Sequence, residues 1–174
     1  MNNTVFLKFV FNGKCNIGTP GILLFDANGN RIGSNRVVRI VYDDFKADMP
    51  ATPHLFDGSS TCRLWFAQTT SERATIIVEF DMTNINRIAK VGLCQWPNGS
   101  WTNNAIDVYI SKDNENYTYG TTVALDASVG YSQYRYQTCN IPFFFASQSI
   151  KSGVENVIAN NKLFKKYVMI YEEG

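Results

Sequence analysis

Few residues in this chain could perform acid–base or nucleophilic chemistry. His54 is the single histidine, and Asp57 and Cys62 are the carboxylate and thiol close to it in the sequence. A Ser–His–Asp or Cys–His device would have to use this histidine. The chain also lacks a G-x-S-x-G, H-E-x-x-H, P-loop or G-x-G-x-x-G motif. We therefore expect a protein that is not an enzyme, with His54 in a loop or at a rim and the acidic pair Asp43–Asp44 at the surface.

Two polar segments carry the side chains best suited to binding a ligand, QWPNGSWTNN (95–104) and GYSQYRY (130–136). An aromatic ring packs against the C–H face of a sugar, while amide and guanidinium groups bind its hydroxyls. The predicted glycan-binding residues are Trp96, Trp101, Asn103, Asn104, Tyr131, Tyr134 and Arg135. The alternative is structural: Trp96 covers one end of the fold, and the tyrosines pack along a strand.

Three consecutive rings, Phe143, Phe144 and Phe145, follow Pro142. In a strand, successive side chains point to opposite faces, so the three rings cannot all face one core. This run is the predicted protein–protein contact, and packing under the C-terminal segment is the alternative.

Short apolar runs separated by Asn, Gly, Ser, Thr and Asp dominate the chain, and their spacing is typical of a sandwich or barrel. Alternation places Ile76, Val78 and Phe80 on one face, and Asn28–Gly29 predicts a hairpin turn. One short helix is expected over 152–164. The predicted strands cover 4–11, 21–32, 36–44, 74–82, 87–96, 105–113, 122–127, 133–141 and 165–171.

The totals limit the partners. The chain has 174 residues, which suits a single domain over 1–174. Its 16 basic and 15 acidic residues leave a net charge of +1, so we expect no nucleic acid partner. No apolar stretch approaches the length of a membrane helix, and the N-terminus does not resemble a signal peptide. The four cysteines are Cys15, Cys62, Cys94 and Cys139. We expect them to be free thiols, although their spacing does not exclude a disulfide.

Three segments, in order, resemble one family. HLFDGSSTCRLWF (54–66) looks like its F-D-G turn followed by Thr and Trp, ATIIVEFDMTNINRIAKVGL (74–93) resembles its central strand pair, and NAIDVYISKDNENYTYGTTV (104–123) is similar to its strand–turn–strand motif. In the third segment Tyr117 stands where the family usually has Trp. The family is the discoidin, or coagulation-factor C-type, domain, which belongs with galactose-binding-like carbohydrate-binding modules.

The resemblance implies an all-β, galactose-binding-like jelly-roll sandwich with at most one short helix. It implies that Asp57–Gly58 forms a turn, that Trp65 fills the gap between the sheets, and that ligands bind at loops at one end. Calcium is the one cofactor that it raises, with Asp57, Ser60 and Thr61 offering oxygen ligands. The second carboxylate that the family uses near its C-terminus is absent from YVMIYEEG, so Asp57 as a turn cap is the favoured interpretation.

Two functions fit these features. The favoured one is a non-catalytic structural or attachment component of a larger assembly, such as a phage tail, baseplate or head-decoration protein. Its partners are other virion proteins, or further copies of the chain as a homo-oligomer. It would be found in a virion, or in the bacterial cytoplasm during assembly. The alternative is a stand-alone module that binds a host or bacterial surface glycan. No membrane partner is expected in either case.

Overall fold

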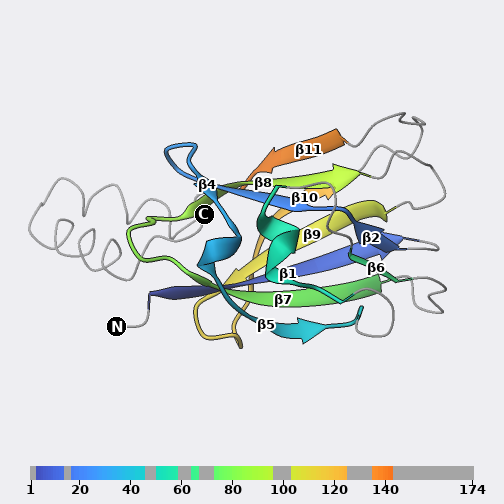
Figure 1. The fold of residues 1–174 in the computed structure, drawn as a ribbon, viewed down its shortest axis with the longest axis horizontal. Helices are drawn as coiled ribbons and strands as arrows, with labels where there is room; N and C mark the ends of the chain where they lie inside the picture. Colours follow the sequence, from blue (N-terminus) through green and yellow to red (C-terminus); the bar gives the residue numbers. More distant parts are fainter. Residues whose placement is uncertain are drawn as a thin grey trace, which may run out of the picture. The chain divides into compact units, whose positions relative to one another are not determined.

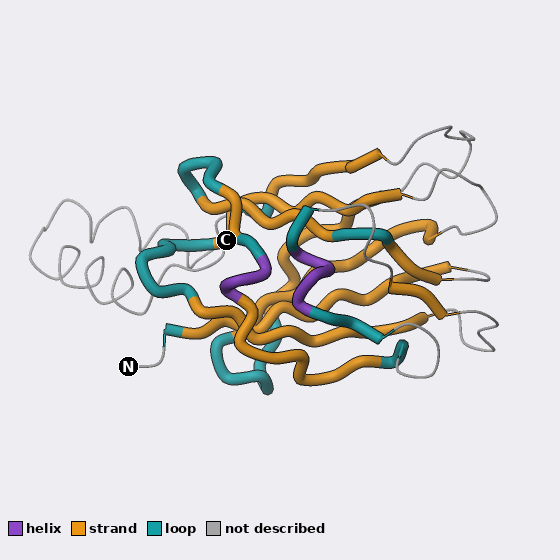
Figure 2. Tube along the Cα trace, in the orientation of Figure 1, coloured by secondary structure: helices purple, strands orange, loops and turns teal. Residues whose placement is uncertain are grey.

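The computed structural model describes residues 3–13, 17–45, 50–58, 64–66, 73–95, 103–124 and 135–142. All of them belong to the first of two compact units of the chain, residues 1–142. Strands dominate this part, with two short 3-10 helices, η1 (Ser34–Arg36) and η2 (Pro53–Phe56) (Figures 1 and 2). The predicted helix over 152–164, the predicted strand over 165–171 and the phenylalanine run 143–145 lie outside the described residues. The described strands are β1 (Thr4–Gly13), β2 (Ile17–Thr19), β3 (Ile22–Asp26), β4 (Arg31–Ile32), β5 (Val37–Asp43), β6 (Leu64–Phe66), β7 (Arg73–Asp81), β8 (Ile88–Gln95), β9 (Asn103–Ser111), β10 (Thr118–Ala124) and β11 (Arg135–Asn140).

The strands form two main antiparallel sheets. The larger has the order β10-β9-β1-β7-β5 and the smaller the order β11-β8-β3-β4, while β2 and β6 make a separate pair (Figure 1). This architecture confirms the predicted all-β sandwich. The jelly-roll connection of its strands stays a prediction.

The centre of the larger sheet is β1, which pairs with β7 on one side and β9 on the other. Phe9 lies opposite Ile76 and opposite Val108, and all three side chains are fully buried. Period-two alternation therefore holds on these strands, as the sequence predicts. The inward face of the sheet includes Leu7, Phe9, Phe11, Ala74, Ile76, Val78, Phe80, Ile106, Val108, Ile110 and Val123.

The smaller sheet supplies the opposite side of the core. Its β3–β4 hairpin turns at the predicted Asn28–Gly29 pair, where the Asp26 amide donates to the Asn30 carbonyl at 2.8 Å. Gly29 has a φ of +83°, which an L side chain rarely adopts. The buried apolar side chains of this sheet are Ile22, Leu24, Ile32, Ile88, Val91, Leu93 and Cys94.

Aromatic rings of η2 and of the segment after β5 pack onto the larger sheet. Helix η2 contacts β3 of the smaller sheet and β5 of the larger one. It carries Phe56, whose ring meets Phe80 edge-on at 5.0 Å and Phe9 at 6.2 Å between centroids. A second edge-on pair, Phe11 and Phe45, lies 5.4 Å apart. The segment before the Asp57–Gly58 turn is therefore part of the core.

Strand β5 departs from simple alternation. Its register against β7 shifts between Val37 and Arg39 and again between Ile40 and Tyr42. Each shift is a bulge, which inserts one extra residue into the edge strand. As a result the inward-facing partners of Phe80, Val78 and Ile76 are Val37, Ile40 and Asp43, which are spaced by three residues.

The spacing on β5 turns Asp43 inward, so the predicted surface position of this acid is wrong. Its side chain is buried and accepts hydrogen bonds from the Phe45 amide at 2.8 Å and the Ala51 amide at 2.7 Å. Buried carboxylates need such partners because burial removes their hydration. Asp43 thus fixes both ends of the segment between β5 and η2.

Strand β6 holds Trp65 opposite Gly18 of β2. Trp65 therefore lies within a strand. Its side chain lies outside the description, so its role between the sheets stays a prediction.

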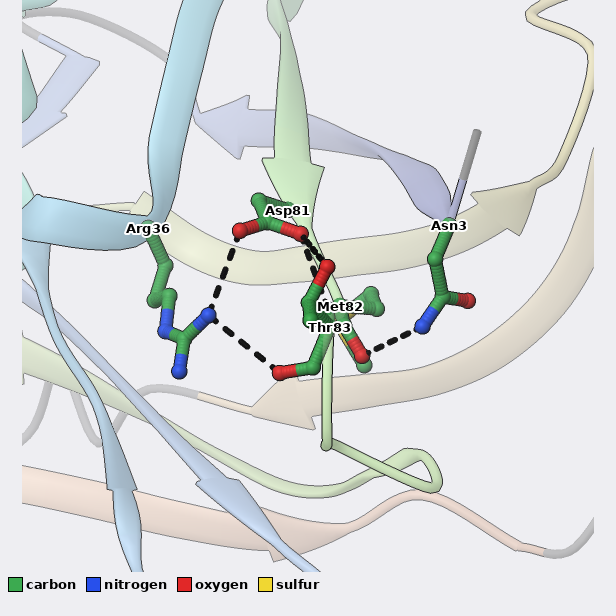
Figure 3. A network of polar contacts seen from close by, with 5 residues as sticks. All are labelled: Asn3, Arg36, Asp81, Met82 and Thr83. Carbon is green, nitrogen blue, oxygen red and sulfur yellow. Dashed lines mark hydrogen bonds and ion pairs between the residues drawn. The ribbon is translucent and has the colours of Figure 1, made fainter. Parts of the chain in front are cut away.

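A polar network joins the start of β1, the end of β7 and helix η1 (Figure 3). Asn3 and Met82 exchange two hydrogen bonds of 2.7 Å. Arg36 pairs with Asp81 at 3.2 Å and donates to the Thr83 carbonyl at 3.3 Å. Asp81 in turn accepts from the Thr83 amide and hydroxyl at 2.8 and 2.6 Å, so one carboxylate orders the turn after β7.

The same arrangement recurs at other strand ends, since short acidic side chains accept amide hydrogens two to four residues ahead. Asp26 accepts from the Asn28 and Asn30 amides. Asp113, just after β9, accepts from the Asn116 side chain and amide at 2.7 and 2.8 Å. These bonds favour the charged form, and they lower the pKa of Asp113, of Asp26 and of Asp81.

These aspartates predict a loss of stability in acid. A lowered pKa in the folded state stabilises the fold above the unfolded pKa of about 3.9, and this contribution disappears as the pH falls through the folded pKa. The thermal midpoint, measured by circular dichroism, should fall steadily from pH 5 to pH 2. Asp113→Asn should have a lower midpoint at pH 6 and a shallower pH dependence. Parallel curves for wild type and variant would show that Asp113 does not contribute.

Candidate binding surface

The predicted glycan-binding segments attach to the sandwich at adjacent positions. β8 ends at Gln95 and β11 begins at Arg135, and these two residues are partners across the smaller sheet. Asn103 and Asn104 open β9, with Asn103 opposite Gly13 of β1. The register therefore places Gln95, at the start of the first segment, beside Arg135 of the second, and glycan binding by these segments stays a prediction. The predicted aromatic contacts Trp96, Trp101, Tyr131 and Tyr134 lie outside the described residues.

The Asp57–Gly58 turn is present as predicted. Gly58 has a φ of +78°, and a Cβ built there would lie 2.3 Å from Nη2 of Arg31. The same nitrogen donates to the Phe56 carbonyl at 3.2 Å. Glycine is therefore favoured here by its backbone conformation, and the guanidinium of Arg31, at the end of a flexible side chain, occupies the space beside it.

His54 lies at the rim of this turn, as predicted. Its side chain is 78% exposed, and Nδ1 lies 3.6 Å from Oδ2 of Asp57. In the predicted calcium set, Ser60 and Thr61 lie outside the described residues. Among the residues that are described, no three His, Cys, Asp or Glu side chains come together as a metal-binding group.

Cys94 and Tyr136 are partners across β8 and β11. Burial raises the pKa of Cys94 to about 11 and that of Tyr136 to about 12. Both groups are therefore neutral at physiological pH, and a neutral thiol is a poor nucleophile. Cys94 and Cys139, the two cysteines in the described part of the chain, are both thiols.

The outer face of the larger sheet carries a row of side chains that crosses all five strands. Pairing places Tyr119 opposite Tyr109, Tyr109 opposite Lys8, Lys8 opposite Ile77, and Ile77 opposite Tyr42. We call these five residues the tyrosine row. Four strand spacings of about 4.8 Å give it a length of about 19 Å. Its end residues are both exposed, Tyr119 by 47% and Tyr42 by 45%.

Packing holds the rings of the row in place. Tyr109 and Tyr119 meet edge-on with centroids 5.7 Å apart. Nζ of Lys8 lies 5.6 Å from the centre of the Tyr109 ring and 5.2 Å from that of Tyr117. These are cation–π distances, so the ammonium group is oriented without using its three hydrogen-bond donors.

A hydrogen-bond chain runs beside the row. Asp107 accepts from the Asn12 amide at 3.0 Å and from the Thr122 hydroxyl at 2.5 Å. A carboxylate only accepts, so the Thr122 hydroxyl must donate to it. The Tyr119 hydroxyl, 2.7 Å from Thr122 Oγ1, then donates to Thr122. The chain fixes Tyr119 in position and leaves its hydroxyl oxygen available as an acceptor.

Sequence reasoning missed this surface. Alternation on 105–113 correctly places Ile106, Val108 and Ile110 inside, which puts Asp107 and Tyr109 outside. Nothing in the order of the sequence shows that Tyr119, Lys8 and Tyr42 extend the same line. The one sequence signal that could have revealed this surface is the presence of tyrosines at outward positions of the strands.

No helix in the part of the chain that the structure describes is long and apolar enough to cross a membrane. Comparison of the chain with models of protein families, with curated proteins and with solved structures gives no match. The discoidin-like assignment therefore stays a prediction that rests on the three sequence motifs.

Proposed function

We propose that this protein is a non-catalytic attachment component of a larger assembly, of the kind found in phage tails, baseplates or head decorations. One observation carries the proposal: in the described part of the chain, the three most exposed large hydrophobic side chains, Val38, Tyr42 and Tyr119, all belong to the five-stranded sheet. They lie on its edge strands, β5 and β10. Large exposed apolar side chains on a rigid sheet are available for contact with a partner.

The edge of β5 is the proposed contact within the assembly. Its two bulges interrupt the ladder, and bulges on an edge hinder the addition of another strand. A contact through side chains is therefore favoured over strand addition, and Val38, at 53% exposed, is its apolar centre. The ring of Tyr42 stands on the outer face rather than at the edge, so this contact leaves the tyrosine row accessible.

Size-exclusion chromatography with light scattering tests this proposal on the full chain. The protein should elute as a defined multiple of its 19.6 kDa mass, and Val38→Lys should shift it toward the monomer by about tenfold in dissociation constant, because the lysine charge is costly to bury. Val10→Thr, on the sheet face, is the matched control. A protein that stays monomeric even at 100 times the concentration first used for chromatography would contradict the proposal.

A stand-alone glycan-binding module is the second candidate. The tyrosine row favours it, because exposed rings beside a fixed set of donors and acceptors suit sugar recognition. The two functions are compatible, since an attachment component needs a surface that recognises its target.

A further inference from the structure

We propose that the tyrosine row is a glycan-binding site that takes a neutral oligosaccharide lying across the strands of the larger sheet. The inference rests on the proposed attachment function and names the class of target. It places recognition on the sheet face, away from the 95–104 and 130–136 segments that the sequence predicts.

The shape of the surface comes from the pairing of the strands. The exposed rings of Tyr119 and Tyr42 stand at opposite ends of the row, with Tyr109, Lys8 and Ile77 half-buried between them. Figure 1 shows the five strands of this sheet side by side in the order β10, β9, β1, β7 and β5. Two aromatic anchors separated by about 19 Å fit an extended ligand better than a single sugar.

The chemistry of the row suits a polyol. The face of an aromatic ring carries partial negative charge and attracts polarised C–H groups, which sugar rings present on their flat sides. Among the described residues, the Lys8 ammonium and the Tyr109 hydroxyl have no hydrogen-bond partner, so both are available to sugar hydroxyls. The Tyr119 oxygen adds an acceptor, because its proton is already donated to Thr122.

The charge of the surface selects a neutral ligand. Lys8 contributes one positive charge and Asp107 one negative charge, and the Asp107 carboxylate is already occupied by Asn12 and Thr122. At the other end, Asp44 accepts the Tyr42 hydroxyl at 2.5 Å, and the negative charge beside it raises the pKa of Tyr42. Arg39 and Glu79 beside this end also pair, at 2.7 Å. A surface with balanced charges complements neutral hydroxyls and does not favour a polyanion.

The site is also fixed before a ligand arrives. Tyr119 is held by Tyr109 and Thr122, Lys8 by two rings, and Tyr42 by Asp44. Because these side chains lose little freedom on binding, the entropic cost of recognition is small. Exposed side chains that are ordered without an internal packing role favour a binding role.

A glycan array that displays bacterial and mammalian surface glycans, probed with the labelled full-length protein, tests the proposal. The wild type should bind one or more neutral glycans. Tyr119→Ala and Tyr42→Ala should each weaken binding by about tenfold or more, because aromatic anchors dominate binding energy. Lys90→Ala, which removes a lysine that lies over the Phe25 ring on the smaller sheet, is the matched control and should bind within about twofold of wild type.

Two outcomes would overturn the site: no glycan bound, or binding that is lost in Trp101→Ala and unchanged in both row variants. A circular dichroism melt of each variant separates lost binding from lost folding. A protein ligand in place of a glycan would also reject the proposal. The array measures glycan binding and light scattering measures the oligomeric state, so the two proposals can fail separately. A monomer that binds glycans through the row would reject the assembly proposal and support the glycan site.

Discussion

Replacing Phe56 with alanine is expected to lower the free energy of unfolding by about 3–5 kcal/mol, the usual cost of removing a buried aromatic ring. Phe56 is fully buried and touches Phe9 and Phe80, so the change leaves a cavity where η2 joins the two sheets. Urea unfolding followed by tryptophan fluorescence measures the loss.

Phe56→Leu is the matched control, because it keeps most of the apolar volume and should cost less than about 2 kcal/mol. A loss below about 1 kcal/mol for the alanine variant would mean that η2 does not pack between the sheets. The resembling motif gives Phe56 only as part of a turn signature, so this test also separates its structural role from the resemblance.

Asp43→Ala should cost about 2–4 kcal/mol. The change leaves the Phe45 and Ala51 amides without their acceptor, and each buried unsatisfied donor costs about 1–3 kcal/mol. Removing a buried charge and admitting water recover part of this loss. The same urea experiment applies, and the slope with denaturant should stay unchanged because the compactness of the fold is preserved.

Asp43→Asn separates the charge from the hydrogen bonds. The amide oxygen still accepts from one of the two backbone amides, while the NH₂ group faces the other donor, so we expect about half the alanine loss. Equal stability of wild type and Asp43→Ala would show that this carboxylate does not close the segment between β5 and η2.

Local patterns of the sequence predict much of the fold. Alternating apolar residues on β7 and β9 identify their inward faces because one face of each strand must be buried. Asn28–Gly29 predicts the β3–β4 hairpin because the turn needs a residue with positive φ. The Asp57–Gly58 turn can be predicted for the same reason. The position of Arg31 beside Gly58 cannot be predicted, because Arg31 is distant in the sequence.

Long-range pairing explains what the sequence could not predict. The tyrosine row depends on β1 lying between β9 and β7, and on β5 and β10 forming the two edges. The sequence predicts Asp43 at the surface because nothing in VVRIVYD indicates the two bulges that turn its side chain inward. Trp96 and Trp101 are predicted from the composition of the segment around them. Composition identifies a local polar segment, but it does not identify an outward face that five distant strands share.

The proposed site changes what the fold is expected to do. In the family that the motifs resemble, ligands bind at loops at one end of the sandwich. Here the tyrosine row lies on the face of a sheet, which is more rigid than a loop and holds a binding surface more accurately. A glycan lying across the strands would use that rigidity.

A nuclear magnetic resonance titration tests the central claim most directly. The ¹⁵N-labelled full-length protein is titrated with an oligosaccharide from the tightest-binding neutral glycan on the array. We predict that the largest amide shifts fall around Lys8, Tyr109, Tyr119 and Tyr42, on four of the five strands of the larger sheet. Shifts confined to residues 95–104 and 130–136, with the sheet face unchanged, would contradict the account and return the site to the loops.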